Sequence, residues 1–137
     1  MKVIFNSFIP WGKAMGMTVI KWIFCRKSWE AYQYSNLFKK MVNHEHVHEA
    51  QILDFAPSWM PCRHLFGSLF FYPLYLLEWL LKIIPATVGE ANPYRSISFE
   101  IEAYLNEYDY EYLKKRKRFA SFKYLFKLWN TNTKLGK

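Results

Sequence analysis

The hydrophobic pattern of the first 55 residues predicts a small β region followed by a helix. Residues 17–25 combine β-branched and aromatic side chains, with the polar Lys21 among them, and this composition is typical of a strand. An earlier strand is predicted over residues 3–9. From 36 to 55 the chain has no Gly or Pro and is rich in helix-forming residues, so it predicts a helix that Pro57 closes.

Residues 65–84 form the most apolar stretch of the chain. They predict a helix that is kinked or broken at Pro73, because proline lacks the amide hydrogen of a helical bond. Residues 65–85 are long enough for a membrane span, but Glu78 and Lys82 would then place charges in hydrocarbon, at a cost of about 2.5–3.5 kcal/mol each. Their i, i+4 spacing allows them to pair on a helix. We therefore favour a buried or interfacial helix, with a membrane-spanning helix as the alternative.

The C-terminal third predicts more helix. Residues 85–93 contain two prolines and a glycine, which indicates a loop. A long helix is predicted over 97–118, and either Ser96 or Ser98 can cap its start. A short aromatic helix is predicted over 119–129. The predicted fold class is therefore α+β and helix-rich.

Length and composition fit a single folded domain. The chain has 137 residues, of which 52% are hydrophobic. This is enough to fill one core, and it excludes a chain that is disordered as a whole. One domain over 1–137 is expected, with residues 130–137 as a frayed end. The two cysteines, Cys25 and Cys62, are too few for a disulfide framework. Aromatic residues reach 20%, which indicates a partner, a membrane interface or a substrate groove in addition to the core.

The first residues differ from a secretory signal. Residues 1–7 carry a lysine but no long apolar run and no small-residue cleavage site, and Pro10 and Gly12 interrupt the next residues of the chain. We therefore expect no signal peptide and a cytoplasmic location. Peripheral or integral attachment to the inner membrane is an open alternative.

The helix predicted over 36–55 contains an HExxH sequence, His44-Glu45-His46-Val47-His48. Residues i and i+4 of a helix stand about 40° apart and one turn above each other, so His44 and His48 can reach one metal ion. Glu45 lies about 100° around the helix, close enough to contact a water molecule on that metal. His46 faces about 200° away from His44 and cannot share the ion. The pattern predicts a metal site, the alternative being a polar helix face without metal.

A catalytic zinc site needs three protein ligands and an open position for water. The third ligand is expected among the glutamates of the later helix, which are Glu100, Glu102, Glu107 and Glu111. Glu100 shares a face with the small Ala103, which would let the two helices approach closely. We favour Glu100 as the ligand, with Glu102 as the alternative, and Gln51 could bond a ligand ring. Two imidazoles and one carboxylate suit Zn²⁺ well.

These two segments together resemble the gluzincin family of zinc metallopeptidases, in which HExxH on one helix precedes a glutamate on a later helix. Residues 43–51 (Asn-His-Glu-His-Val-His-Glu-Ala-Gln) and 98–104 (Ser-Phe-Glu-Ile-Glu-Ala-Tyr) are similar to small HExxH proteins of bacteria and, in size, to the minigluzincins. The resemblance implies a zincin-like fold. By resemblance, Zn²⁺ is bound by His44, His48 and Glu100, and the general base is Glu45.

Tyr104 is a departure from the family pattern, because many gluzincins have there an aspartate that orients a ligand histidine. A phenol donates a hydrogen bond where a carboxylate accepts one, which would change the tuning of the metal. Tyr104 is also a candidate second donor to the oxyanion of a peptide-bond hydrolysis, as are Tyr94 and Tyr108. The strand predicted over 17–25 would lie along the cleft and pair with an extended substrate, as zincin sheets do by resemblance.

Two functions are compatible with these residues. The first is a zinc-dependent peptidase, with Glu45 and Tyr104 in catalysis, working in solution or at a membrane surface. The alternative is a non-catalytic, metal-binding interaction module that is derived from a peptidase and associated with a membrane. A structural zinc site has no need of a carboxylate beside its histidines, so the presence of Glu45 favours the peptidase.

A basic block lies among aromatic residues near the C-terminus: Lys114, Lys115, Arg116, Lys117 and Arg118. The chain carries a net charge of +8, which favours anionic partners. At an acidic membrane surface each such charge is worth about 1 kcal/mol, so an anionic membrane is the expected partner. The alternative is a solvated helix end, where cations complement the helix dipole. Nucleic acid is disfavoured because no nucleic-acid-binding motif accompanies the block.

Overall fold

The computed structural model describes residues 2–10 and 14–129, and the frayed end predicted for 130–137 lies outside them. Three strands precede the long helices: β1 (Lys2–Asn6), β2 (Gly16–Val19) and β3 (Trp22–Arg26). They form one sheet in the order β1-β3-β2, in which β1 is parallel and β2 antiparallel to β3. β2 therefore lies at an edge of this sheet.

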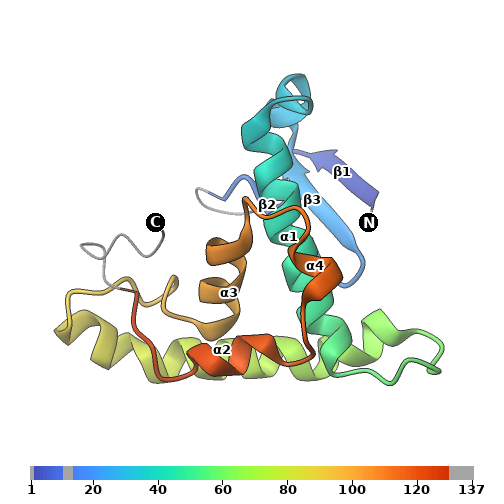
Figure 1. Cartoon of the computed structure of the whole chain (residues 1–137). Coiled ribbons are helices and arrows are strands. Elements are labelled where there is room, and N and C mark those ends of the chain that lie inside the picture. The colour runs from blue at the N-terminus through green and yellow to red at the C-terminus, as the bar shows by residue number, and fades with distance from the viewer. Residues whose placement is uncertain (1, 11–13, 130–137) are drawn as a thin grey trace.

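Helices make up most of the remaining chain, which confirms the α+β, helix-rich fold class. They are η1 (Lys27–Tyr32), α1 (Asn36–Asp54), α2 (Arg63–Val88), α3 (Ser98–Asn106), α4 (Tyr112–Lys115) and η2 (Ala120–Tyr124), where η marks a 3₁₀ helix. Figure 1 shows α1 running from the sheet to α2, which lies across the base of the molecule, with α3 standing beside α1.

The single strand predicted over 17–25 is wrong, because the chain turns back within it. β2 and β3 form a hairpin whose turn contains Ile20, which has a φ of 57°. A β-branched residue is rare in this left-handed conformation, so the sequence gives no turn signal there. A contact from a distant helix holds the turn, since the Ile20 amide donates to Tyr72 Oη at 3.0 Å.

Helix α1 agrees with the helix predicted over 36–55. Ser35 precedes it as N-cap, and its hydroxyl accepts a hydrogen bond from the Phe38 amide at 3.1 Å. The first turns pack Phe38 and Met41 against Ile23 and Cys25 of β3 in one buried cluster. The sheet thus anchors the N-terminal half of α1 and leaves the later half to contact α2 and α3.

Helix α2 is longer than predicted. It is not broken at Pro73, and Pro85 lies inside it rather than in a loop. Both prolines are on the exposed side of the helix, where the missing amide hydrogen disturbs no packing against the rest of the protein. On the inner side, Gly67 lets α2 cross α1 closely, because a Cβ at this position would lie 2.1 Å from the Ile52 carbonyl oxygen.

The long helix predicted over 97–118 is also wrong, since α3 ends at Asn106. The cause lies in α1, where the Asn43 side-chain amide donates to the carbonyl oxygens of Asn106 at 3.1 Å and Glu107 at 3.0 Å. These carbonyls would otherwise accept bonds from a continuing helix. Only the single turn α4 and the short η2 follow, in place of the aromatic helix predicted over 119–129.

The start of α3 is held by a charged side chain of α2. Ile97 occupies the N-cap position, so neither serine predicted as the cap is in that place. The Glu78 carboxylate instead accepts from the Ser98 amide and hydroxyl, each at 2.7 Å. Lys82 pairs with Glu78 at 2.7 Å, as their spacing predicts. A buried ion pair of α2 therefore fixes where α3 begins, two residues before Glu100.

We expect Gly67→Ala to lower the free energy of unfolding by about 1–3 kcal/mol, because the new methyl group must push the backbone of α1 away. Gly16→Ala is the control, since its methyl group would meet only the Met41 side chain, which can move. Urea unfolding of both variants provides the measurement. Equal stability of Gly67→Ala and the unmodified protein would contradict the close crossing of α1 and α2.

Candidate metal centre

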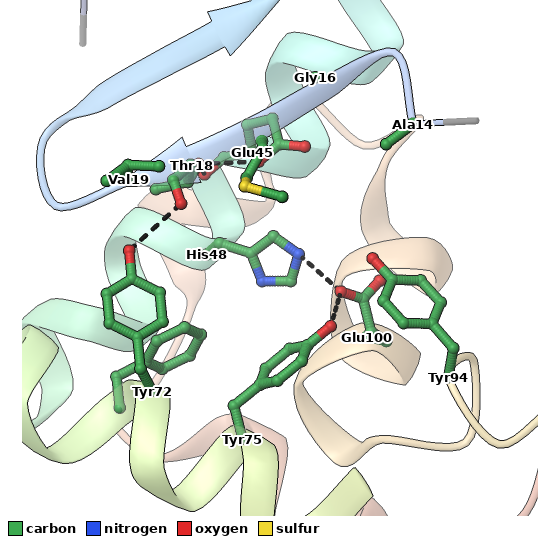
Figure 2. A pocket seen from close by; sticks show the side chains of 12 residues that line it. Ala14, Gly16, Thr18, Val19, Glu45, His48, Tyr72, Tyr75, Tyr94 and Glu100 are labelled. Atoms are coloured by element: carbon green, nitrogen blue, oxygen red, sulfur yellow. Dashed lines mark hydrogen bonds and ion pairs between the residues drawn. The ribbon is translucent and has the colours of Figure 1, made fainter. Parts of the chain in front are cut away.

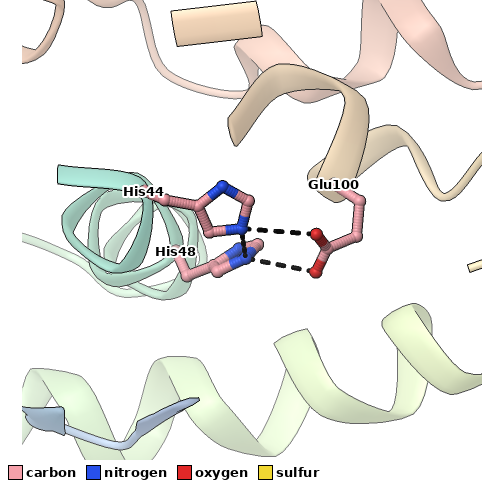
Figure 3. A group of neighbouring side chains, drawn as sticks. All are labelled: His44, His48 and Glu100. Atoms are coloured by element: carbon pink, nitrogen blue, oxygen red, sulfur yellow. Dashed lines mark hydrogen bonds and ion pairs between the residues drawn. The ribbon is translucent and has the colours of Figure 1, made fainter. Parts of the chain in front are cut away.

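Three buried side chains from two helices converge on one point (Figure 3). His44 and His48 extend from α1, and Glu100 extends from α3. Their exposed fractions are 7%, 7% and 1%. Glu100 Oε2 lies 3.3 Å from His44 Nε2, and Glu100 Oε1 lies 3.2 Å from His48 Nε2. The two histidine Nε2 atoms are themselves 3.2 Å apart.

This arrangement could hold a metal ion. One ligand atom from each of the three residues lies within 4.8 Å of the others. Two ring nitrogens that face each other and a carboxylate compete for the same few protons, and Glu100 Oε2 is buried with no hydrogen-bond partner among the described residues. A cation at the common point would satisfy all of these atoms together. Two imidazoles and a carboxylate are also a ligand set that zinc accepts.

When no metal is bound, the interactions among these residues favour protonated histidines and an ionised Glu100. Burial lowers the pKa of His44, but the nearby carboxylates of Glu100 and Glu107 outweigh it and raise that pKa to about 10. The pKa of His48 is also raised, since Glu100 outweighs burial there. Burial raises the pKa of Glu100, yet the two histidines hold it well below its usual range. A metal ion must therefore displace protons from this group.

Gln51 fixes the orientation of the His48 ring. Its Oε1 lies 2.8 Å from His48 Nδ1, and its amide nitrogen donates to the Phe99 carbonyl at 2.9 Å and to Glu102 at 3.0 Å. Because both donations define which end of the amide is oxygen, His48 must carry its proton on Nδ1. His48 Nε2 is then available toward Glu100 and His44. Gln51 thus makes the contact to a ligand ring that its spacing suggested.

His44 is oriented differently from what the sequence suggested. Its Nδ1 lies 3.5 Å from Glu107 Oε2, and Glu107 is paired with Lys40 at 2.9 Å. Tyr104 instead places its ring edge-to-face on the His44 ring, with 4.6 Å between centroids. The carboxylate facing this histidine is therefore one turn beyond Tyr104. The signal was present in the sequence, since Glu107 is seven residues from Glu100 and shares its helix face.

Glu102 lies away from the two histidines. It is fully buried and accepts hydrogen bonds from Arg116 Nε at 2.6 Å and Tyr112 Oη at 2.8 Å. Arg116 also forms a two-point ion pair with Asp54, at 3.0 and 2.7 Å. Only 5% of the Arg116 side chain is exposed, so this member of the basic block is turned inward. The structure thus brings Glu100, not Glu102, to the histidines.

A cavity of 310 Å³ opens beside His48 and Glu100 (Figure 2). Edge strand β2 forms one wall, α2 forms another, and Glu45 and His48 lie between them. Glu45 Oε2 accepts a hydrogen bond from Thr18 Oγ1 of β2 at 2.8 Å, which holds the carboxylate at the wall. A second cavity, of 300 Å³, borders His44 and Glu45 on the other side. Glu45 therefore faces space on both sides of the candidate metal position.

Several tyrosines surround the site, including one that sequence reasoning missed. Tyr75 of α2 donates to Glu100 Oε1 at 2.7 Å, and burial beside that charge raises its pKa well above the usual value. Tyr94 borders both cavities and Tyr104 borders the second. Tyr108 is 70% exposed and lies against Lys40 instead. The sequence gives no signal for Tyr75, because nothing in an apolar helix indicates which residue will face a carboxylate.

The remaining histidines form a separate cluster. Glu49 Oε2 lies 3.3 Å from His46 Nδ1, and Glu49 Oε1 lies 3.0 Å from His64 Nε2. This contact joins α1 to the start of α2. His46 therefore lies apart from His44 and His48. Its angle on the helix predicts this separation.

Comparisons of this chain with protein-family models, curated proteins and solved structures found no match. The functional assignment accordingly rests on geometry and on the HExxH pattern. Together they give a buried His44–His48–Glu100 group consistent with an HExxH-type metal site on α1.

We expect the purified protein, once supplied with zinc, to retain about one ion per chain, in keeping with a single site of three ligands. His48→Ala and Glu100→Gln should each lose it, because each removes one of three ligands. His46→Ala is the matched control on the same helix and should keep the ion. Elemental analysis after gel filtration gives the count, and equal metal content in all four proteins would argue against this site.

Metal affinity should rise with pH up to about 10, since the pKa of His44 is raised to about 10 and the ion must displace that proton. Each displaced proton strengthens apparent binding about tenfold per pH unit. Calorimetric titration at pH 7 in two buffers of different ionisation enthalpy measures the released protons directly. Identical heats in both buffers would show that no proton leaves.

Proposed function

We propose that this protein is a zinc-dependent peptidase in which Glu45 acts as the general base. The observation that carries the proposal is the meeting of three elements at one cavity. The His44–His48–Glu100 group supplies the metal position, Glu45 supplies a carboxylate that is not a ligand, and β2 supplies an edge to which no other described strand pairs. A structural metal site requires only the first of these.

The metal ion that suits this group is zinc, with three protein ligands and one position left for water or substrate. When bound, zinc acts as a Lewis acid that acidifies a water molecule and polarises a carbonyl group. The protein's part is to hold the ligand rings in place. Gln51 and Glu107 do so from behind His48 and His44 respectively.

Glu45 is suited to move a proton within the cavity. Thr18 Oγ1 donates to one of its carboxylate oxygens, and the other, which no described residue engages in a hydrogen bond, can accept a proton from water. The same carboxylate can return that proton to the amine that leaves when the peptide bond breaks. General acid and base action of this kind typically accelerates a reaction by about 10²–10⁴-fold.

The edge of β2 offers a place for an extended peptide. Arg26 of β3 donates to the Met15 carbonyl at 3.3 Å, and bonded pairs alternate along an antiparallel ladder. The odd-numbered residues of β2 therefore bond to β3, and Gly16 and Thr18 turn their backbone groups to the free edge. Tyr72 Oη already donates to the Thr18 carbonyl at 3.2 Å. An entering peptide would thus pair chiefly with Gly16 and the Thr18 amide.

Tyrosines supply hydrogen-bond donors for the oxyanion of the reaction. Burial raises the pKa of Tyr104 to about 12, so its phenol keeps its proton at neutral pH. Tyr94 borders both cavities, and Tyr75 already donates to Glu100. Tyr104 and Tyr94 are therefore the preferred donors.

We expect Glu45→Gln to lower peptide hydrolysis by about 100-fold or more while the zinc content stays unchanged, because glutamine cannot accept the proton. Glu49→Gln, on the same helix but facing His46 and His64, should keep full activity. The measurement is the rise in fluorescence when zinc-loaded protein is added to a mixture of quenched fluorescent peptides.

Two outcomes would contradict the peptidase proposal. One is hydrolysis by Glu45→Gln at the unmodified rate. The other is a zinc-loaded protein that cleaves none of the peptides, which would favour the non-catalytic metal-binding module instead.

A further inference from the structure

The outer face of α2 is covered with leucine. Among the described residues, the large aliphatic side chains of this helix that are more than half exposed are Leu65, Leu69, Leu76, Leu77, Leu80, Leu81, Ile84 and Val88. They recur along the whole helix rather than at one end. A continuous apolar surface of this length is unusual for a protein surrounded by water and marks an interaction site.

Two of the three charged residues of α2 face the opposite way, and the third, Arg63, is half-buried at the first residue of the helix. Glu78 and Lys82 are only 7% and 6% exposed, and both contact the segment that begins α3. A surface helix of a water-soluble protein buries its leucines and exposes its charges. Helix α2 does the reverse along its length, so its outer side is built for an apolar environment.

The segment 119–128 extends this apolar face. Phe119 lines a cavity together with Phe66 and Phe70 of α2, and the Lys127 carbonyl accepts from Lys82 at 3.2 Å. The large apolar side chains exposed on this segment are Phe119, Phe122, Leu125, Phe126 and Leu128, of which Phe126 is 96% exposed. Two stretches that are distant in sequence therefore present apolar side chains side by side.

Apart from Glu90, just after α2, the exposed charges around this face are positive. No acidic residue follows Glu111 in the sequence, and the only acidic residue of α2 is the buried Glu78. Lys117, Lys123 and Lys127 are exposed, the last two beside the aromatic ring of Tyr124. Apolar and aromatic side chains bordered by lysine match the boundary between acyl chains and anionic headgroups of a lipid bilayer.

We propose that the outer face of α2, together with segment 119–128, lies in the surface of an anionic lipid bilayer, with α2 parallel to the membrane plane. The proposal is independent of the peptidase function.

The parallel orientation follows from how α2 contacts the rest of the protein. Its 26 residues are long and apolar enough to cross a membrane, at ~1.5 Å per residue. However, Gly67, Tyr75 and Lys82, near its start, middle and end, all contact the segments of α1 and α3. A spanning α2 would therefore pull the buried charges of those helices into hydrocarbon.

Flotation of the purified full chain with vesicles tests this surface. The protein should float with vesicles of phosphatidylcholine and phosphatidylglycerol, and less with phosphatidylcholine alone. The double variant Leu77→Glu/Leu81→Glu should bind about tenfold or more weakly, because two carboxylates would enter the apolar boundary. Leu37→Glu, at an exposed leucine of α1, is the matched control and should float like the unmodified protein.

A charge variant tests the basic border separately. Lys123→Glu/Lys127→Glu should weaken binding to the anionic vesicles and leave binding to neutral ones unchanged. Circular dichroism and zinc content of every variant establish that the fold is intact. Zinc retained by a variant that no longer floats separates a failure of this surface from a failure of the metal site.

The orientation is tested with thiol labelling. Cys62 is exposed just before α2, and Glu90→Cys adds a second thiol at an exposed position just after it. On vesicles to which protein has been added, a membrane-impermeant maleimide should label both positions. Protection of one of them would mean that α2 spans the bilayer.

Two further results would overturn the proposal. One is that the unmodified protein does not float with either vesicle. The other is a dimer in lipid-free solution that Leu77→Glu/Leu81→Glu converts to monomers, which would assign the face to a second copy of the chain.

Discussion

The interface between α1 and α3 buries two carboxylates only two residues apart, and the rest of the structure depends on how each is neutralised. A buried carboxylate is costly unless it is paired and hydrogen-bonded. Glu102 is paired permanently, by Arg116 from the C-terminal segment and by Tyr112. Among the described residues, Glu100 is paired with two histidines and accepts a hydrogen bond from Tyr75. Glu102 therefore holds the C-terminal segment against α3. Glu100 has partners that could exchange protons for a metal ion.

Much of the candidate metal centre could be predicted from local sequence because it depends on helix periodicity. The spacing of His44 and His48 and the face shared by Glu100 and Ala103 are properties of single helices, and the structure brings them together. Local sequence distinguishes Glu100 from Glu102 as the third ligand less clearly. The choice depends on Arg116, which comes 14 residues after Glu102 and belongs to a basic block that looks like a surface feature.

The errors in the predicted fold have a common physical origin, because each was decided by a contact between distant residues. Asn43 ends α3 from another helix, and Tyr72 holds a turn at Ile20 that has no turn-forming residue. Pro73 stays inside α2 because it faces outward. Local propensity describes what a segment prefers alone, and these segments are shaped by partners that only the folded chain supplies.

The two sides of helix α2 have different surroundings, and the thickness of the helix separates them. Its inner side carries Tyr72 and Tyr75 into the wall of the cavity, whereas its outer side is the leucine face. A helix with its side chains is about 10–12 Å across. If the leucine face rests on lipid, that thickness acts as a fixed spacer, and a substrate anchored in the same bilayer would be met at one set height. Membrane-proximal segments would then reach the cavity in preference to chains free in solution.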